Sequence, residues 1–414
     1  MKYFHKEAAI YFKKKVLMVF GTRPEAIKLV PVIKKLKEYN SKFATIVCVT
    51  AQHRKMLDQV LAIFDIFPDY DLNIMKENQD LFDITIKSLK GLKKVIEKVQ
   101  PDIVLVQGDT TTAFIAGLAA FYLKVPVGHV EAGLRTYNKY NPFPEERNRH
   151  LLSVLTDYHF APTEWSKSNL LKEGIPSENI WVTGNTVIDA LLQVVSSQQS
   201  AVSRKAYQDY FKKQYNLELG TWNSKLATRN SQLILVTCHR RESFGEGFEN
   251  ICQALRTIAE ERGDIEIVYP VHLNPNVQGP VKRILGGIDN IHLIEPLEYE
   301  QFVFLMNSSY LILTDSGGIQ EEAPSLSKPV LVMRNTTERP EGIEAGVVKL
   351  VGTDEDTIVK NTIELLENQV LYEKMSKSVN PYGDGKASER ITKILYSVLA
   401  RNSRAGKNHK GAIR

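Results

Sequence analysis

Cysteine is scarce in this sequence, whose 414 residues include only Cys48, Cys238 and Cys252. No two of them form a CxxC pair and the count is odd, so the sequence supports neither a disulfide framework nor a zinc knuckle. A chain with so few thiols suits a reducing compartment. We therefore expect a cytoplasmic protein without a bound metal.

Long apolar runs are missing as well. The most apolar stretch, Ala113 to Leu123, is too short to span a bilayer. The first fifteen residues, MKYFHKEAAIYFKKK, have no uninterrupted apolar core of the kind that a signal peptide carries. The net charge is only +5, and much of the excess lies in basic residues near the two ends. A solvated tail explains this charge, so we predict neither a nucleic acid nor a membrane as a partner.

The composition that remains is that of a globular protein, with 43% hydrophobic and 24% charged residues. Short apolar strands alternate with helical patterns, beginning with a strand at Val16 to Phe20 and a helix at Ala26 to Glu38. A polar stretch, Ser196 to Ser231, interrupts this rhythm, which restarts at Leu233 to Val236. Such alternation predicts α/β domains with parallel sheets, in which functional groups follow the carboxyl ends of the strands.

We expect two doubly wound, Rossmann-like domains that face each other across a ligand cleft. The expected boundaries are an N-terminal extension (1–15), a first domain (16–195), a linker or insert (196–231), a second domain (232–380), a C-terminal helix that crosses back to the first domain (381–403) and a basic tail (404–414).

The stretch from Leu311 to Gly342 carries the clearest local signal. An apolar strand ends in Thr-Asp-Ser, and Gly317 and Gly318 then open a helix. Backbone N–H groups at a helix start favour an anion, and glycine lets the anion approach closely. Glu322, one turn into the helix, would be repelled by a phosphate unless it faces hydroxyl groups such as those of a ribose. The alternative is an ordinary strand-to-helix turn.

Acidic side chains gather in the first expected domain. Asp109 and Glu131 each follow a predicted strand directly, so they should share one crevice. The second domain offers His239, which stands at the end of a strand beside Arg240. These residues could equally be solvated side chains or surface pairs. His129 lies within a strand and is predicted to be structural.

Eight motifs together make the sequence recognisable. They are GTRPEAIK (21–28), VTAQHRKMLDQVL (49–61), QGDTTT (107–112), GHVEAGLRT (128–136), GNTVIDAL (184–191), HRRESFG (239–245), YPVHLNPNV (269–277) and TDSGGIQEEAPSLSKPVLVMRNTTERPEG (314–342). In this order they resemble the non-hydrolysing UDP-N-acetylglucosamine 2-epimerases of bacterial polysaccharide pathways. The resemblance extends from Val16 to about Ala400.

The resemblance implies the GT-B fold, a homodimer, and an isomerase that needs no nicotinamide or other cofactor. The reaction it implies is reversible inversion at C2 of a UDP-linked sugar, from UDP-N-acetylglucosamine to UDP-N-acetylmannosamine. No carbonyl activates the C2 proton, so UDP is eliminated to leave 2-acetamidoglucal and then adds back. A general base contributes about 10²–10⁴-fold, so stabilisation of the departing diphosphate must supply much of the rest.

The resemblance also assigns residues. The acid/base carboxylates are Asp109, Glu131 and Glu145, supported by Arg149 and His239. The UDP-binding positions are Arg23, Lys28, the backbone at Leu297, Phe302 against uracil, Ser316, Gly317 and Gly318 on phosphate, Glu322 on ribose, and Arg339. A second, activating UDP-N-acetylglucosamine would meet Gln52, His53, Gln79, Arg240 and His272.

Several alternatives remain open from the residues themselves. Phe302 forms a helical stripe with Leu305 and Met306, which is also typical of a core position. Asn78 stands where some relatives of this family carry arginine, so the strength of activation by a second nucleotide stays open. For the whole chain, the alternatives are a GT-B glycosyltransferase, a non-catalytic UDP-sugar sensor and a hydrolysing epimerase.

Overall fold

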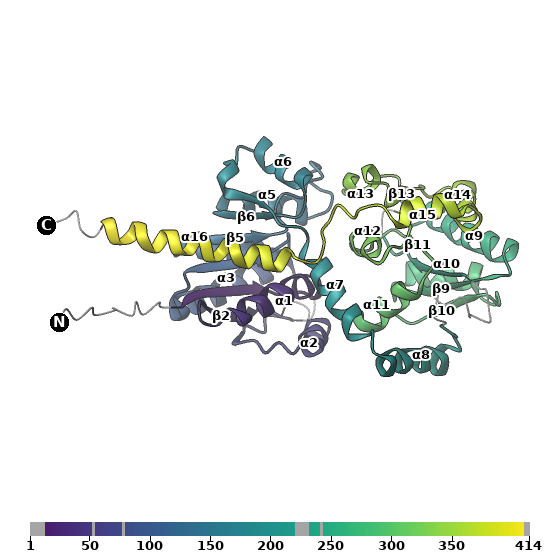
Figure 1. Ribbon diagram of the computed structural model, residues 1–414, viewed down its shortest axis with the longest axis horizontal. Helices are drawn as coiled ribbons and strands as arrows, with labels where there is room; N and C mark the ends of the chain where they lie inside the picture. Colours follow the sequence, from purple (N-terminus) through teal and green to yellow (C-terminus); the bar gives the residue numbers. More distant parts are fainter. Residues whose placement is uncertain (1–12, 52–53, 77–78, 220–231, 241–242, 410–414) are drawn as a thin grey trace, which may run out of the picture. The chain divides into compact units, whose positions relative to one another are not determined.

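The computed structural model describes residues 13–51, 54–76, 79–219, 232–240 and 243–409. The chain divides into two compact units (Figure 1). Unit 1 comprises Met1–Ala190 and Gly385–Arg414, and unit 2 comprises Leu191–Asp384. Each unit is an α/β domain built on a parallel sheet, as the alternation of strands and helices predicts.

Unit 1 contains a seven-stranded sheet in the order β3-β2-β1-β4-β5-β6-β7. Its strands are β1 (Lys14–Phe20), β2 (Phe43–Val49), β3 (Tyr70–Asp71), β4 (Ile103–Gln107), β5 (Val127–Val130), β6 (Tyr158–Ala161) and β7 (Ile180–Val182). All neighbouring strands are parallel. The order of the strands reverses between β1 and β4, and such a switch point is where open α/β sheets place their ligands.

The helices of unit 1 cover this sheet. They are α1 (Arg23–Glu38), α2 (Arg54–Ile63), α3 (Leu81–Val99), α4 (Thr111–Tyr122), α5 (Glu145–Leu155), α6 (Glu164–Lys172) and α16 (Ala387–His409), with a short 3₁₀ turn, η1 (Ser177–Asn179). Helix α7 (Thr186–Ser197) runs from unit 1 into unit 2. No helix in the described part of the chain is long and apolar enough to cross a membrane.

Unit 2 contains a six-stranded sheet in the order β10-β9-β8-β11-β12-β13. Its strands are β8 (Gln232–Thr237), β9 (Ile265–Pro270), β10 (Ile291–Ile294), β11 (Leu311–Thr314), β12 (Val330–Val332) and β13 (Val348–Leu350). Its helices are α8 (Ala201–Tyr215), α9 (Glu246–Glu261), α10 (Pro275–Leu285), α11 (Tyr299–Ser308), α12 (Gly317–Glu322), α13 (Pro340–Glu344), α14 (Glu355–Glu367) and α15 (Gln369–Ser376), with the 3₁₀ turn η3 (Ala323–Leu326).

The structure adds detail to two of the expected segments. The first strand begins at Lys14, which pairs with Phe43, so the sheet starts within the expected N-terminal extension. Much of the polar stretch expected as a linker or insert is helix α8. Its Phe211 is fully buried and stacks on Phe304 of α11, with ring centroids 6.1 Å apart. The remainder of that stretch, 220–231, lies outside the described residues.

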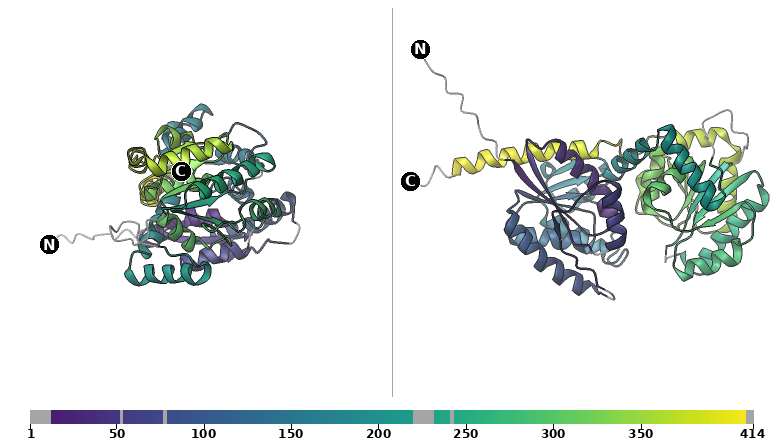
Figure 2. Two further views of the ribbon diagram at one scale, coloured as in Figure 1. Left: turned by 90° about the vertical axis from the view of Figure 1, so that its right-hand side faces the viewer. Right: turned by 90° about the horizontal axis from the view of Figure 1, so that it is seen from below.

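Helix α16 belongs to unit 1 although it lies at the far end of the chain. It packs along α1, and its Tyr396 meets the ring of Phe43 at 6.3 Å (Figures 1 and 2). The start of α16 is held by Asp189 of α7. The Asp189 carboxylate accepts hydrogen bonds from the backbone N–H of Ala387 at 3.1 Å and of Ser388 at 2.8 Å. Asp189 therefore satisfies N–H groups that a helix start leaves without partners.

We expect Asp189→Ala to lower the free energy of unfolding by about 2 kcal/mol, because two buried N–H groups lose their acceptor. Amide hydrogen exchange should locate the effect, with faster exchange at Ala387 and Ser388. Glu389→Ala is the control, since Glu389 lies in the same turn and pairs with the exposed Lys393. Unchanged exchange at the helix start would contradict this role for Asp189.

Candidate active-site residues

The predicted acids of unit 1 follow neighbouring strands. Asp109 comes two residues after β4 and Glu131 directly after β5, and these strands pair with Gln107 opposite Val130. The backbone turns sharply after each of these strands: Gly108 has a φ of 71° and Glu131 a φ of 65°. A positive φ is uncommon for a residue with a side chain, and it marks Glu131 as a position where the fold holds a constrained backbone.

Asp109 lies in an ion pair with Arg149 of α5. Its side chain is 27% exposed, whereas that of Arg149 is 7% exposed. Asn148 donates a hydrogen bond to the backbone oxygen of Asp109 at 2.9 Å. His129 Nε2 lies 2.7 Å from the oxygen of Gly108. Burial lowers the pKa of His129 to about 3, so its ring is neutral and holds the turn before Asp109.

Glu131 is held by a cation and an amide. Lys28 Nζ lies 2.5 Å from Glu131 Oε2, and the Gln107 side chain donates to the same oxygen. The Glu131 side chain is only 5% exposed. Lys28, expected to bind the nucleotide, therefore lies against one of the expected acid/base carboxylates. Gln107 was not singled out from the sequence, although it immediately precedes the Gly-Asp turn.

Two adjacent glutamates begin helix α5 and lie in different environments. Glu145, the expected catalytic residue, is the first helical residue and is partly exposed. Glu146 is fully buried and accepts hydrogen bonds from the backbone N–H of Thr136, at 3.1 and 3.2 Å, and of Tyr137 at 2.9 Å. Glu146 thus shapes the loop before α5, while Glu145 keeps access to solvent.

A buried carboxylate that the sequence analysis did not select joins two loops of unit 1. Glu25 Oε2 accepts from the backbone N–H of Gly21 at 3.0 Å, and from the N–H and hydroxyl of Thr22 at 2.8 Å each. Its Oε1 accepts from the Thr110 hydroxyl at 2.7 Å. The spacing of Thr22 and Glu25 is that of a capping box, so the sequence carried a signal for it. Glu25 thereby links the loop that holds Arg23 to the residue after Asp109.

Burial raises the pKa of Glu25 from 4.5 to about 7, although its four hydrogen bonds oppose the shift. The folded state then holds an additional proton between these values, so stability present below pH 4.5 is lost as pH rises through 7. By linkage the loss approaches about 3 kcal/mol. Glutamine cannot titrate, so urea unfolding should show Glu25→Gln gaining on the parent protein by this amount between pH 4.5 and 8.

Glu38→Gln, at an exposed position of the same helix, is the control and should follow the parent protein at every pH. A constant difference between Glu25→Gln and the parent protein across this range would show that Glu25 does not change its protonation.

In unit 2, the expected residues follow β8 and β11, which are paired with Thr237 opposite Thr314. His239 and Arg240 follow β8, and both are partly buried. Asp315 follows β11 and is fully buried. Its Oδ2 accepts from the backbone N–H of His239 and of Arg240, each at 2.7 Å. The two loops are therefore joined at the edge of the sheet.

Arg339 is buried between two glutamates. Its Nε lies 2.6 Å from Glu321 Oε1, and its Nη1 lies 2.6 Å from Glu338 Oε1. Burial alone would raise the pKa of Glu338, but Arg339 and Arg334 lower it to about 2. A Cβ atom at Gly317 would collide with Arg339 Nη1, so any larger residue there would displace the guanidinium from its present position.

The remaining nucleotide candidates surround helices α11 and α12. Ser316 is the N-cap of α12, which is only six residues long. Glu322 is 9% exposed and accepts from the Tyr299 hydroxyl at 3.4 Å. Phe302 is only partly buried, whereas its neighbours Leu305 and Met306 are fully buried. The alternative interpretation places Phe302 in the core together with Leu305 and Met306. Its partial exposure argues against that interpretation. Leu297 is 9% exposed.

The chain matches the family model described as UDP-N-acetylglucosamine 2-epimerase over residues 34–396. The protein belongs to this family. A UDP-N-acetylglucosamine 2-epimerase of Campylobacter jejuni is 58% identical over 92% of this chain and 97% of its own. The Salmonella typhimurium enzyme of that name is 57% identical over 92% of this chain and 98% of its own.

Solved structures agree with this assignment. The crystal structure of UDP-GlcNAc 2-epimerase from Neisseria meningitidis, bound to UDP-GlcNAc, matches with a TM-score of 0.84 and 53% identity, over 92% of this chain and all of the other. The expected fold of two Rossmann-like domains of the GT-B type is confirmed. A glycosyltransferase from Rickettsia africae, with a TM-score of 0.60 and 16% identity over 95% of this chain and all of its own, shares the fold alone.

The residues that the family resemblance assigned to a second nucleotide are only partly described. Gln52 and His53 lie outside the described residues, as does Asn78. Gln79 Oε1 accepts from the backbone N–H of Lys76 at 3.1 Å. His272 is exposed, and its ring stacks on that of His239 with centroids 5.2 Å apart. Arg240 is held through its backbone by Asp315.

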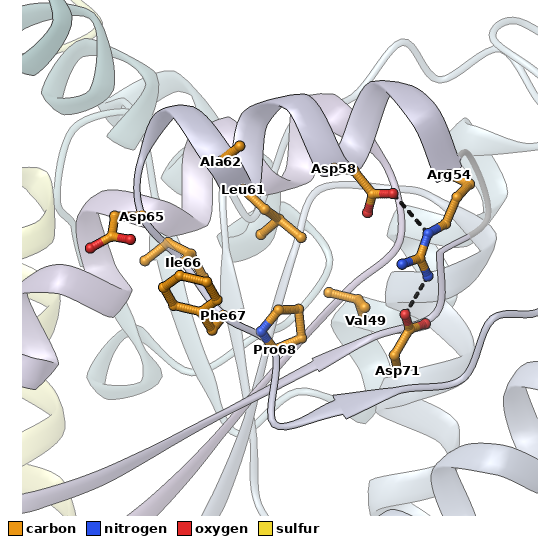
Figure 3. Close-up of a pocket in the computed structure, with 10 residues that line it drawn as sticks. All are labelled: Val49, Arg54, Asp58, Leu61, Ala62, Asp65, Ile66, Phe67, Pro68 and Asp71. Carbon is orange, nitrogen blue, oxygen red and sulfur yellow. Dashed lines mark hydrogen bonds and ion pairs between the residues drawn. The ribbon is translucent and has the colours of Figure 1, made fainter.

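Unit 1 contains a pocket of about 460 Å³, lined by residues of β2, α2, β3 and the loop between α2 and β3. Figure 3 shows Arg54, at the start of α2, between Asp58 of the same helix and Asp71 of β3, with Phe67 and Pro68 lining the other end. Because Arg54 is paired with both carboxylates, it fastens the start of α2 to the sheet. Among the described residues, no group of His, Cys, Asp and Glu side chains could hold a metal ion.

Proposed function

We propose that this protein catalyses the reversible inversion of UDP-N-acetylglucosamine at C2 to give UDP-N-acetylmannosamine. The observation that carries the proposal is identity of 53% over nearly the whole chain to an epimerase crystallised with UDP-GlcNAc. The carboxylates that such chemistry requires are present, and two of them follow adjacent strands of unit 1. The reaction needs only proton transfer and cleavage of a C–O bond, so we propose no cofactor.

The proposed route is an elimination followed by an addition. A carboxylate removes the C2 proton, the C2–H electrons form the C1–C2 double bond, and the C1–O bond breaks to release UDP. The product is 2-acetamidoglucal. UDP then adds back at C1 while a proton is delivered to the opposite face of C2. Each step conserves atoms and charge and is reversible.

Unit 1 would supply the acid/base groups. We assign them to Asp109, Glu131 and Glu145. Arg149 positions Asp109 through their ion pair, while Lys28 and Gln107 hold Glu131. In the proposed route one of these carboxylates acts as the base while another acts as the acid. This division suits a reaction in which one face of the ring loses a proton and the other face gains one.

Unit 2 would hold most of the UDP. We assign the phosphates to Ser316, Gly317 and Gly318, the ribose to Glu322 and the uracil to Phe302. Partial burial supports Phe302, because a stacking ring must keep one face open. Arg339, the Leu297 backbone, and Arg23 and Lys28 of unit 1 complete the set. Stabilisation of the departing diphosphate by such groups is a large contribution to catalysis.

The test is incubation with UDP-N-acetylglucosamine in heavy water, followed by proton NMR of the sugar. Epimerisation places deuterium at C2 of two interconverting UDP-sugars. Free N-acetylmannosamine would instead identify a hydrolysing epimerase. An unchanged spectrum would overturn the proposal in favour of a transferase or a UDP-sugar sensor. The product UDP-N-acetylmannosamine would serve bacterial surface polysaccharide synthesis in the cytoplasm.

We also propose a second, activating UDP-N-acetylglucosamine site at Gln52, His53, Gln79, Arg240 and His272. Equilibrium dialysis of the UDP-saturated protein with labelled UDP-N-acetylglucosamine should then show one labelled nucleotide bound per chain in addition to the UDP. Absence of bound label would contradict this site.

We further propose a homodimer that forms through helices α3, α4 and α5. These helices pack side by side and expose large apolar side chains, namely Phe82, Ile86, Phe121, Tyr122, Leu151 and Val154. Exposed apolar patches of this kind are typical of protein interfaces. Val154→Glu should shift the sedimentation coefficient from dimer to monomer. Val370→Glu on α15 is the control, because Val154 is 79% and Val370 80% exposed; equal behaviour of the two variants would contradict the interface.

A further inference from the structure

A buried carboxylate of unit 2, Asp315, lies beside His239. Asp315 is fully buried at the end of β11, and its Oδ2 accepts from the backbone N–H of His239 and of Arg240 at 2.7 Å each. The adjoining strands are fastened by Thr237 and Thr314, whose hydroxyl oxygens lie 2.6 Å apart. The His239 loop is therefore fixed at its start by groups that are themselves immobile.

Within the described residues, the other oxygen of this carboxylate lacks an N–H or O–H donor, and the neighbouring Cys238 thiol, which interacts with Asp315, is only a weak donor. Asp315 Oδ1 is buried and has no hydrogen-bond partner within the described part of the chain. His239 Nδ1 lies 3.7 Å from this oxygen. A buried acceptor without a donor costs about 1–3 kcal/mol. A small rotation of the imidazole would bring Nδ1–H within hydrogen-bonding distance and remove that cost.

The surroundings of the His239 ring would allow Asp315 to set its orientation and tautomer. Its side chain is 40% exposed, and one face of the ring stacks on His272 at 5.2 Å with 13° between the planes. Burial lowers the pKa of His239; the charge of Asp315 opposes this shift, while His272 and Arg240 add to it. The ring is therefore neutral in the unliganded protein at pH 7. In a neutral imidazole, the nitrogen that carries the proton decides what the other nitrogen can do.

We propose that Asp315 is a positioning residue for His239: it accepts the Nδ1–H and thereby directs Nε2 toward the diphosphate of the substrate. This inference rests on the proposed function, in which His239 supports the reaction. When the anionic diphosphate binds, it favours the imidazolium, whose second proton comes from solvent and sits on Nε2. That proton can be donated to the phosphate oxygen that leaves C1, and Asp315 stabilises the positive charge from the other side.

Asp315→Asn separates this role from a merely structural one. The amide oxygen can still accept from the two backbone N–H groups, but its NH₂ group faces Nδ1 and imposes the opposite tautomer. In the serine-protease triad, the equivalent change lowers kcat by about 10⁴-fold. Here His239 is a supporting group, so we expect a fall in kcat of about 100-fold or more. The affinity for UDP should stay within about threefold of the parent value.

A double-mutant cycle provides the decisive test. If Asp315 acts through His239, Asp315→Asn should cause no further loss of kcat in a His239→Ala background. Additive losses, or a single variant within about threefold of the parent kcat, would overturn the proposal. Asp354→Asn is the matched control, since Asp354 also accepts a backbone N–H but at the exposed start of α14.

A second measurement does not depend on turnover or on Asp315→Asn being folded. Nitrogen NMR of ¹⁵N-histidine-labelled parent protein with UDP bound should show His239 protonated at Nδ1, with the signal identified by its loss in His239→Ala. A neutral ring protonated only at Nε2 would overturn the positioning role. Failure of the proposed function would appear separately, as absence of deuterium at C2 with the parent protein.

Discussion

Asp109→Asn should retain UDP binding and lose turnover by about 10³-fold. Asparagine has the shape of aspartate and preserves the packing at the end of β4, but it cannot accept the proton of the sugar at neutral pH. General acid–base groups contribute about 10²–10⁴-fold, which sets the scale of the loss. The same substitution removes the charge that pairs with Arg149.

The measurement combines two readouts on one sample. Incorporation of deuterium at C2 gives turnover, and calorimetry with UDP gives affinity. Asp102→Asn is a matched control, because Asp102 flanks the opposite end of the same strand and pairs with Lys14 at 2.8 Å. Its turnover should be unchanged. If Asp109→Asn weakened UDP binding and left the turnover of saturated enzyme intact, Asp109 would be a binding residue and not an acid or base.

Arg339→Ala should lower the free energy of unfolding by about 3–5 kcal/mol in addition to weakening UDP binding. The side chain of Arg339 is 10% exposed and that of its partner Glu321 is 1% exposed. Removal of one member of a buried pair leaves an uncompensated charge, which is far more destabilising than loss of a surface pair. Both Glu321 and Glu338 would lose their ion pair with Arg339.

The stability that Glu338 contributes to this cluster should depend on pH. The pKa of Glu338 is lowered from 4.5 to about 2 in the folded state. Its contribution to stability is therefore complete above pH 4.5 and is lost as pH falls toward 2. In Arg339→Ala, Glu338 loses the largest of the interactions that lower its pKa, so this acid-dependent part of the stability should shrink. Urea unfolding between pH 3 and 7 measures both effects.

Arg283→Ala is the control for Arg339→Ala. Arg283 also lies 2.6 Å from a glutamate, Glu249, but their side chains are 60% and 50% exposed. Exposed pairs contribute about 0–1 kcal/mol, so this variant should unfold almost like the parent protein. Similar losses in the two variants would show that the Arg339 cluster is no better shielded from solvent than the Arg283–Glu249 pair. A stable Arg339→Ala that binds UDP weakly would assign Arg339 to the ligand alone.

Much of the fold could be predicted from local patterns. The continuous apolar runs at Val16 to Phe20 and Leu311 to Leu313 are buried parallel strands, because a strand covered on both faces needs apolar residues at every position. The turn after β4 could also be predicted, because Gly108, which adopts a positive φ, directly precedes Asp109. Helix α8 was harder to place, because its sequence is polar and only Phe211 is buried.

The amino-acid sequence by itself determined the strand–helix alternation, the family and the identity of the candidate acids, because these depend on neighbours along the chain and on motif order. Only the tertiary structure decided which charges meet. Asp315 reaches His239 across 76 residues, and Lys28 reaches Glu131 across 103. No periodicity encodes such pairs, since they depend on which strand ends lie side by side and how completely the packed core excludes water from each carboxylate.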